Sequence, residues 1–137
     1  MKDRFLIEFR PVMQGLLDEG GPIAVCGDYN ICHTSIDIHN PVSNANASGF
    51  KPEERAWMTK LLDDGGVVDV FRTLNQKAEQ YTWWSNRGNA RANNVGWRLD
   101  YHLATPALAA LARREAIYKA EKFSDHAPLT IDYDFSL

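Results

Sequence analysis

Residues 22–30 read PIAVCGDYN, a short apolar run that leads directly into Asp28, Tyr29 and Asn30. The run follows two glycines, which are typical of a turn, so it predicts a buried β-strand. Asp28 and Asn30 then lie where this strand ends. Because functional side chains concentrate in loops held by a rigid sheet, the end of this strand is a candidate site.

Two helices are predicted on either side of this strand. Apolar residues recur at helical spacing over residues 5–17, with Pro11 inside the pattern, where it should kink the helix or delay its start. Residues 52–62, PEERAWMTKLL, form the clearest helix. A proline suits its first position, and the two glutamates that follow favour the positive end of the helix dipole.

The remaining pattern indicates a sheet protein. Strands are predicted at residues 67–71, 81–84, 97–104, 116–120 and 129–135, with a short helix over residues 106–114. Helices and strands interleave without a fixed repeat, which favours an α/β or α+β fold. Two long polar loops, residues 31–50 and 85–96, join these elements.

Composition excludes several classes of protein. The 137 residues are 45% hydrophobic and 11% aromatic, which fits one globular domain. A net charge of −3 gives no support for nucleic-acid binding from charge alone. The longest apolar runs fall well short of the roughly 20 residues of a membrane span. We expect a cytoplasmic domain with two reduced cysteines and no membrane partner.

Polar side chains stand at the ends of several predicted strands: Asp28, Asn30, Asp100 and Asp125, with His126 directly after Asp125. If the strands are neighbours, these side chains converge on one rim, where they suit phosphodiester hydrolysis. Asp125 would hold Mg²⁺, which takes one or two carboxylates plus water. Asp100 would orient His126, Asn30 would bind the phosphate, and Asp28 would transfer a proton.

Each residue also has an ordinary structural explanation. Asp28 could close a turn by bonding the backbone two positions on. Asp125 could be a loop residue, and Asp100, flanked by apolar residues, could be a satisfied polar group in the core. The joint pattern favours a site, because three short polar motifs each fall at the end of a predicted strand.

The sequence holds two further clusters of potential ligand-binding residues. Cys26, Cys32, His33 and His39 are soft-metal ligands, but their spacing does not match a zinc pattern. Four aromatic residues flank a loop with three arginines, a combination that suits stacking and phosphate contact: Tyr81, Trp83, Trp84, Trp97, Arg87, Arg91 and Arg98. Alternatively the tryptophans are core, and alternation should then bury one of the two adjacent ones.

Six stretches together resemble the exonuclease III and AP endonuclease family of the endonuclease/exonuclease/phosphatase superfamily. They are GDYN (27–30), GFKPEERAW (49–57), VVDVFR (67–72), YTWW (81–84), NARANNVGWRLDYHLA (89–104) and SDHAPL (124–129). GDxN and SDH are shared across the superfamily, whereas NVGWRLDY and PEERAW point to the branch that repairs abasic sites.

The resemblance implies a DNase I-like four-layer α/β sandwich and an enzyme that uses Mg²⁺ or Mn²⁺. It would nick double-stranded DNA 5′ to abasic sites and would have 3′-exonuclease and 3′-phosphatase activity, in the cytoplasm at the nucleoid. By the same resemblance the catalytic residues are Asp28, Asn30, Asp100 and His126. Metal ligands would be Asp125, Asp28 and Asn30. DNA contacts would be Asn44, Asn46, Trp83, Arg87 and Trp97, with Trp83 and Trp97 lining the pocket for the abasic sugar.

The resemblance covers one half of the family fold, from about Gly21 to the end of the chain. The family's first half carries a metal-binding glutamate, an asparagine and a tyrosine without counterparts here. We therefore expect residues 1–137 to be a C-terminal half, truncated at its N-terminus, with one mixed, mostly antiparallel sheet and flanking helices. Alone, it should cleave DNA weakly or not at all and expose one sheet face.

Two rival functions remain open at this stage. One is a superfamily phosphatase that acts on phosphoinositides or other small phosphate esters. The other is a half-domain that binds DNA or a partner without turnover. The segment around Trp97 favours DNA over a small phosphate.

Overall fold

The computed structural model describes residues 2–136 of the chain. In chain order its elements are α1 (Lys2–Asp18), β1 (Ala24–Asp28), a 3₁₀ turn (Ser35–Asp37), α2 (Pro52–Gly65), β2 (Val68–Asp69), α3 (Val70–Leu74), β3 (Trp83–Trp84), β4 (Gly96–Trp97), β5 (Asp100–Ala104), α4 (Pro106–Ala109), β6 (Ala112–Ile117) and β7 (Leu129–Tyr133). Among these residues, every helix is too short or too polar to cross a bilayer.

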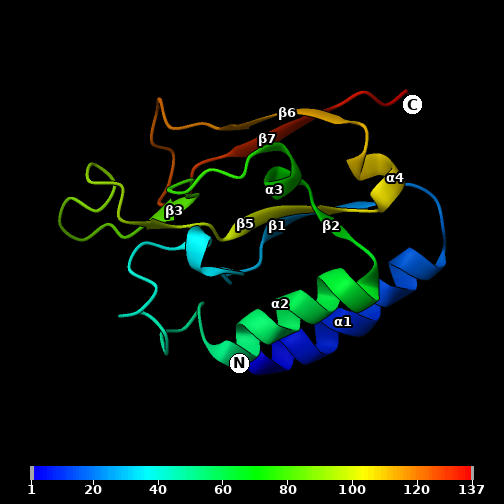
Figure 1. Cartoon of the computed structure of the whole chain (residues 1–137), viewed down its shortest axis with the longest axis horizontal. Helices are drawn as coiled ribbons and strands as arrows, with labels where there is room; N and C mark the ends of the chain where they lie inside the picture. Colours follow the sequence, from blue (N-terminus) through cyan, green and yellow to red (C-terminus); the bar gives the residue numbers. More distant parts are fainter. Residues whose placement is uncertain (1, 137) are drawn as a thin grey trace.

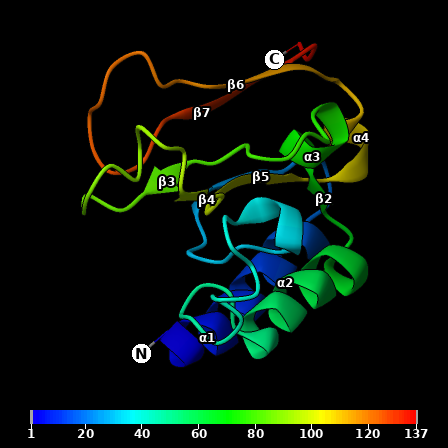
Figure 2. The ribbon, with the colours of Figure 1, turned by 60° about the vertical axis from the view of Figure 1, so that its left-hand side comes forward.

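The middle layer is an antiparallel sheet with strand order β1–β5–β2. Helices α1 and α2 lie together on one face of this sheet, and the β6–β7 hairpin lies on the other, as Figures 1 and 2 show. Side chains alternate along β5, so Tyr101 and Leu103 join the core beneath the sheet, which includes Met13 and Met58. His102, on the opposite face, stacks on Tyr133 of β7.

Residues 81–84, which include β3, form backbone hydrogen bonds with segments on both sides. Strand β3 pairs with β4, with Trp83 opposite Trp97. On its other side, the Trp84 N–H donates to the Asp125 carbonyl at 3.2 Å, and the Ala127 N–H donates to the Thr82 carbonyl at 2.8 Å. The SDH stretch is therefore held along β3, close to the start of β5.

Strand β1 differs from the buried strand that the sequence predicts. Ala24, Cys26, Gly27 and Asp28 are all exposed, and Val25 alone is partly buried. The reason is topological, because β1 is an edge strand that pairs with β5 on one side. Its apolar character therefore marks a surface that this chain leaves uncovered.

Several boundaries also differ from the prediction. Helix α1 runs from Lys2 through Pro11, so its start is not delayed. Val70 and Phe71 are helical rather than extended, and Arg113 and Arg114 are extended rather than helical. The strand predicted over 97–104 is interrupted at Arg98 and Leu99. Within residues 2–136 the strands form three antiparallel sheets, where the sequence predicts one mixed, mostly antiparallel sheet.

Candidate active site

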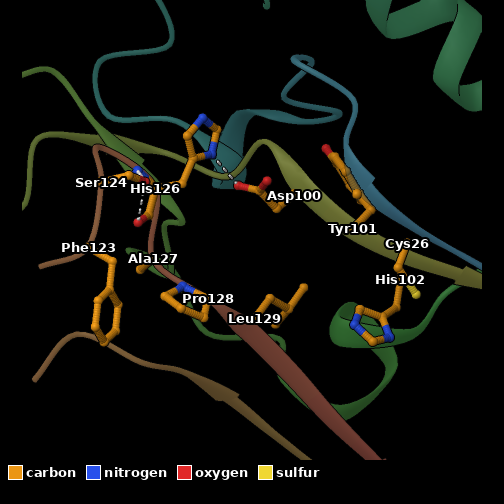
Figure 3. Close-up of a pocket in the computed structure, with 11 residues that line it drawn as sticks. Cys26, Asp100, Tyr101, His102, Phe123, Ser124, His126, Ala127, Pro128 and Leu129 are labelled. Atoms are coloured by element: carbon orange, nitrogen blue, oxygen red, sulfur yellow. Dashed lines mark hydrogen bonds and ion pairs between the residues drawn. The ribbon is translucent and has the colours of Figure 1, made fainter. Parts of the chain in front are cut away.

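The centre of the site is a pair of residues from different parts of the fold. Asp100 is the first residue of β5, and its Oδ2 lies 2.8 Å from Nδ1 of His126 (Figure 3). Burial lowers the pKa of His126, but the hydrogen bond and charge of Asp100 outweigh it and leave this pKa raised. Because the carboxylate accepts at Nδ1, the proton is held there and Nε2 is the atom turned to other groups.

Asp28 completes a chain of three titratable groups. Its Oδ2 lies 3.6 Å from Nε2 of His126. Its Oδ1 accepts the Asn30 N–H at 2.7 Å, so the turn proposed for GDYN forms as well. Partial burial and the charge of Asp100 raise the pKa of Asp28, although the Asn30 N–H acts in the opposite direction. A carboxylate with a raised pKa beside an imidazole is suited to moving a proton.

Asp125 faces a tryptophan rather than this chain of groups. The Trp83 Nε1–H donates to Asp125 Oδ2 at 2.9 Å. This hydrogen bond is the main reason that the pKa of Asp125 is lowered, so its carboxylate stays ionised. Trp83 therefore both lines the site and orients a negative charge at its edge.

A group of three residues presents ligand atoms that could hold a divalent cation. Asp28, Asp100 and His126 present ligand atoms that all lie within 4.8 Å of one another. Asp100 already uses Oδ2 on His126, which leaves Asp28, with a 44% exposed side chain, as the carboxylate open to a metal. The donors fit a hard cation that keeps several waters. The set predicted from sequence, Asp125, Asp28 and Asn30, shares Asp28 with this group.

These residues open into a cavity of about 340 Å³, lined by Asp28, Asn30, Ser48, Trp83, Trp97, Leu99 and His126. Trp83 and Trp97 meet edge to face, with ring centroids 6.0 Å apart and planes at 89°. Trp84 points to the other face and is buried, so alternation does bury one of the adjacent tryptophans. The cavity thus has an aromatic wall on one side and the Asp–His–Asp chain on another.

Comparison with known proteins places this site in a family. Residues 1–126 match the Endonuclease/Exonuclease/phosphatase family. The chain belongs to this family. It is 42% identical over 126 residues to the DNA repair nuclease APEX1 of Danio rerio, covering 91% of this chain and 40% of the relative. It is 39% identical over 116 residues to an exodeoxyribonuclease of Bacillus subtilis, covering 84% of this chain and 46% of the relative.

Solved structures confirm the DNase I-like fold. An AP endonuclease from Archaeoglobus fulgidus superposes with a TM-score of 0.88 at 32% identity, over 96% of this chain and 53% of that one. The 3′ phosphatase NExo from Neisseria, bound to product DNA hairpin, gives a TM-score of 0.91 at 26% identity, over 97% and 53%. The chain therefore spans about half the length of the relatives it matches.

Some of the predicted DNA contacts line the cavity and others lie away from it. Trp83 and Trp97 line the cavity, whereas Asn44, Asn46 and Arg87 lie outside its lining. The Asn44 amide donates to the carbonyls of His39 and Asn40, so it shapes its own loop. Asn46 and Arg87 are exposed in the two long loops.

Two of the three arginines expected at phosphates have structural partners instead. Arg91 packs over the Trp84 ring at 4.9 Å. Arg98 is 1% exposed and pairs with Asp37 at 2.8 Å and Asp69 at 2.6 Å. A buried arginine satisfied by two carboxylates is not free to bind a phosphate. It instead fixes the chain between the cavity residue Trp97 and Asp100.

The zinc cluster considered from the sequence does not assemble. Cys26 is exposed on β1, while Cys32 is buried with its thiol donating to the Asp37 carbonyl at 3.2 Å. Within residues 2–136, the group of three potential metal ligands contains neither cysteine. Burial raises the pKa of both thiols, which further disfavours thiolate ligation.

A larger cavity, about 390 Å³, adjoins the site between the sheet and the segment that leads into β7. Figure 3 shows Cys26 and His102 from the sheet facing Phe123 and Leu129 across it. Phe123 is 69% exposed. Apolar side chains thus surround an open space directly beside His126.

Proposed function

We propose that this chain forms half of the catalytic unit of a DNA repair nuclease that hydrolyses a phosphodiester 5′ to an abasic site. The observation that carries this proposal is the chain Asp100–His126–Asp28, which opens into a cavity walled by Trp83 and Trp97. It is supported by family membership and by relatives named as repair nucleases and exodeoxyribonucleases. The relative named as a 3′ phosphatase favours 3′-phosphate removal as a related activity.

The residues divide the chemistry between them. Asp28 takes the proton of a water that attacks phosphorus, since its pKa is raised and His126 is adjacent. His126, held by Asp100, presents Nε2 to the phosphate. The phosphorus–oxygen bond to the 3′ oxygen breaks, and that oxygen takes a proton from solvent and leaves as a 3′-hydroxyl. Trp83 and Trp97 would receive the flipped-out abasic sugar, which lacks a base to clash with them.

A divalent cation, Mg²⁺ or Mn²⁺, would be held by Asp28 with Asn30 or Asp125 and would neutralise charge on the phosphate oxygens. The donor chemistry of Asp28 and Asn30, a carboxylate and an amide oxygen that line the open cavity, supports such an ion. The lowered pKa of Asp125, due first to the Trp83 N–H, keeps that ligand ionised.

We further propose that residues 1–137 need a second α/β segment for full activity. Its support is the exposed edge strand β1, the apolar cavity beside His126, and the double length of the relatives. Such a segment would cover Cys26 and Phe123 and supply further groups at the rim of the site.

The test is cleavage of a duplex with a single abasic site in Mg²⁺. The chain would be assayed alone and with the amino-terminal part of the Bacillus subtilis exodeoxyribonuclease supplied in trans. We expect nicking to need both parts and to be lost in His126→Ala and Asp28→Asn, but kept in Lys77→Ala, an exposed residue outside the site. Hydrolysis of an inositol phosphate in place of DNA would favour the phosphatase alternative. DNA binding that is insensitive to chelator and produces no nicks would favour the non-catalytic one.

A further inference from the structure

Thr82 lies behind the site, within the YTWW stretch, where the sequence alone assigns it no role. It is 0% exposed, although threonine is a polar residue. Its hydroxyl oxygen accepts two backbone hydrogen bonds, from the N–H of Leu99 at 3.0 Å and from the N–H of Asp100 at 3.2 Å. A single buried hydroxyl therefore holds the backbone at the start of β5, where Asp100 projects toward His126.

The backbone of Thr82 holds the other half of the pair. Its carbonyl accepts the N–H of Ala127 at 2.8 Å, the residue directly after His126. Its own N–H donates to the carbonyl of Trp97 at 3.0 Å. One residue thus contacts the backbone beside His126, Asp100 and the aromatic wall of the cavity.

This arrangement matters because the chain is irregular between β4 and β5. Arg98 turns inward to its two carboxylates, and its backbone N–H donates to the Asp37 carbonyl at 2.8 Å. Regular pairing with β3 ends there, so the Thr82 side chain continues the bonding that the β3 backbone provides at Trp97. Because Thr82 bonds the backbone at Asp100 and the backbone next to His126, it sets the distance between them.

We propose that Thr82 is a positioning residue, whose hydroxyl fixes the backbone of Asp100 relative to His126 so that the Asp100–His126 hydrogen bond is formed before substrate binds. This inference rests on the proposed hydrolysis for its catalytic meaning, but its geometric content stands apart from any activity. A misplacement of about 1 Å can reduce a rate by about 10²-fold, so the hydroxyl has a measurable catalytic consequence.

The test compares Thr82→Val, which keeps the shape but removes the acceptor, with Thr82→Ser, which keeps the hydroxyl. Thr105→Val is the matched control, because its hydroxyl oxygen also accepts a backbone N–H, that of Ile23 at 3.2 Å, at the far end of β5. The readout is the ¹H and ¹⁵N resonance of His126 Nδ1–H in labelled chain, which reports the hydrogen bond to Asp100. We expect it to move upfield or vanish by exchange in Thr82→Val, and to stay in place in Thr82→Ser and Thr105→Val.

Stability and kinetics separate positioning from general damage. Both valine variants should lose thermal stability, but the His126 signal should change in Thr82→Val alone. With the amino-terminal part of the Bacillus subtilis exodeoxyribonuclease supplied in trans (the complemented nuclease), kcat should fall by about 10²-fold for Thr82→Val, with KM for DNA unchanged. Thr82→Ser should keep the kcat of wild type. If Thr82→Val does not fold, Thr82→Cys replaces it, since a thiol sulfur is a weaker acceptor.

An unchanged His126 signal in folded Thr82→Val or Thr82→Cys would overturn the proposal. So would an equal change in Thr105→Val, or a failure of Thr82→Ser to keep the signal. If the wild-type complex does not cleave abasic DNA, the proposed function fails, while the resonance comparison still decides whether Thr82 sets the Asp100–His126 pair.

Discussion

The Oδ2 atom of Asp100 and the Nδ1 atom of His126 lie 2.8 Å apart, although the two residues are separated by 26 positions and His126 lies outside the strand that Asp100 begins. Asp100 begins β5, and His126 lies in the segment bonded along β3. Neither β5 nor the segment along β3 defines this distance alone. The pair therefore depends on how β5 packs beside β3.

Replacing Asp100 by Asn should leave the fold intact and reduce turnover of the complemented nuclease by about 10² to 10⁴-fold, the range in which loss of an orienting carboxylate falls. The amide would present a donor or a weaker acceptor to Nδ1, so the imidazole would lose its fixed tautomer. Single-turnover nicking of an abasic duplex measures the effect. A variant with wild-type rates would show that Asp100 is a structural residue.

The same pair predicts a pH dependence of stability. The folded pKa of His126 is raised above its unfolded value of about 6.5, so its contribution is fully present below that pH and is lost as pH rises through the folded pKa. We expect the free energy of unfolding of wild type to exceed that of Asp100→Asn most near pH 6 and least near pH 9. Urea titrations at both pH values check this. A difference that grows with pH would contradict it.

Trp83 should control the ionisation of Asp125. Trp83→Phe removes the Nε1–H donor, so the pKa of Asp125 should rise from its lowered value toward the ordinary one. Carboxyl ¹³C shifts of Asp125 followed through an acid titration measure this. Trp97→Phe is the control, because the Trp97 ring meets Trp83 edge-on while the described hydrogen bond to Asp125 comes from Trp83. Equal shifts in both variants would assign the effect to packing instead.

The sequence predicts the residues at the site better than it predicts their partners. Asp28 and His126 were expected at strand ends because polar residues directly follow or precede apolar runs, and they do converge. Asp125 is predicted as a metal ligand, and the structure adds a partner that the sequence does not predict, because its carboxylate accepts a tryptophan N–H. That contact joins residues 42 positions apart, and local patterns carry no information on such a distance.

Local sequence patterns likewise predict the outline of the fold but not the contacts between distant segments. Period and composition identify α2 and β7, whose neighbours in space do not alter their local preference. They fail at Arg98, which looks like a surface cation until Asp37 and Asp69 are brought to it, and at β1, whose apolar residues indicate burial that this chain alone does not provide. Tertiary contacts decide both cases.

Gly49 supports the aromatic wall of the cavity. It has φ of +99°, and a Cβ there would lie 2.8 Å from Trp97 Cζ3 and 3.3 Å from the Asn30 carbonyl. Gly49→Ala should therefore destabilise the fold by about 1–3 kcal/mol through strain and overpacking, and should displace Trp97. Gly88→Ala is the control, since its φ is +57° but its Cβ would meet open space, which leaves the backbone penalty alone. Urea unfolding of both variants gives the comparison, and equal losses would rule out the contact with Trp97.

Removing the charge of Arg98 should lower the free energy of unfolding more than removing an exposed charge. Arg98→Met leaves Asp69 without its cation and leaves Asp37, which is 1% exposed, with Arg72 as its remaining cation. We expect a loss of about 3–5 kcal/mol, because an uncompensated buried charge remains. Arg114→Met, which breaks an exposed pair with Asp132 at 3.1 Å, should cost about 1 kcal/mol or less.

Low pH should weaken the ion pairs that Asp37 makes with Arg98 and Arg72. Burial raises the pKa of Asp37, but the charges and hydrogen bonds of Arg98 and Arg72 outweigh it and hold that pKa below its ordinary value. Its stabilisation is therefore present above the unfolded pKa of about 3.9 and is lost as pH falls through the lower folded pKa. The stability gap between wild type and Asp37→Asn should be full at pH 7 and should narrow below about pH 4. A gap that is constant down to acid unfolding would mean that the Asp37 charge does not stabilise the fold, and that the variant loses stability through the altered side-chain hydrogen bonds to Arg72 and Arg98.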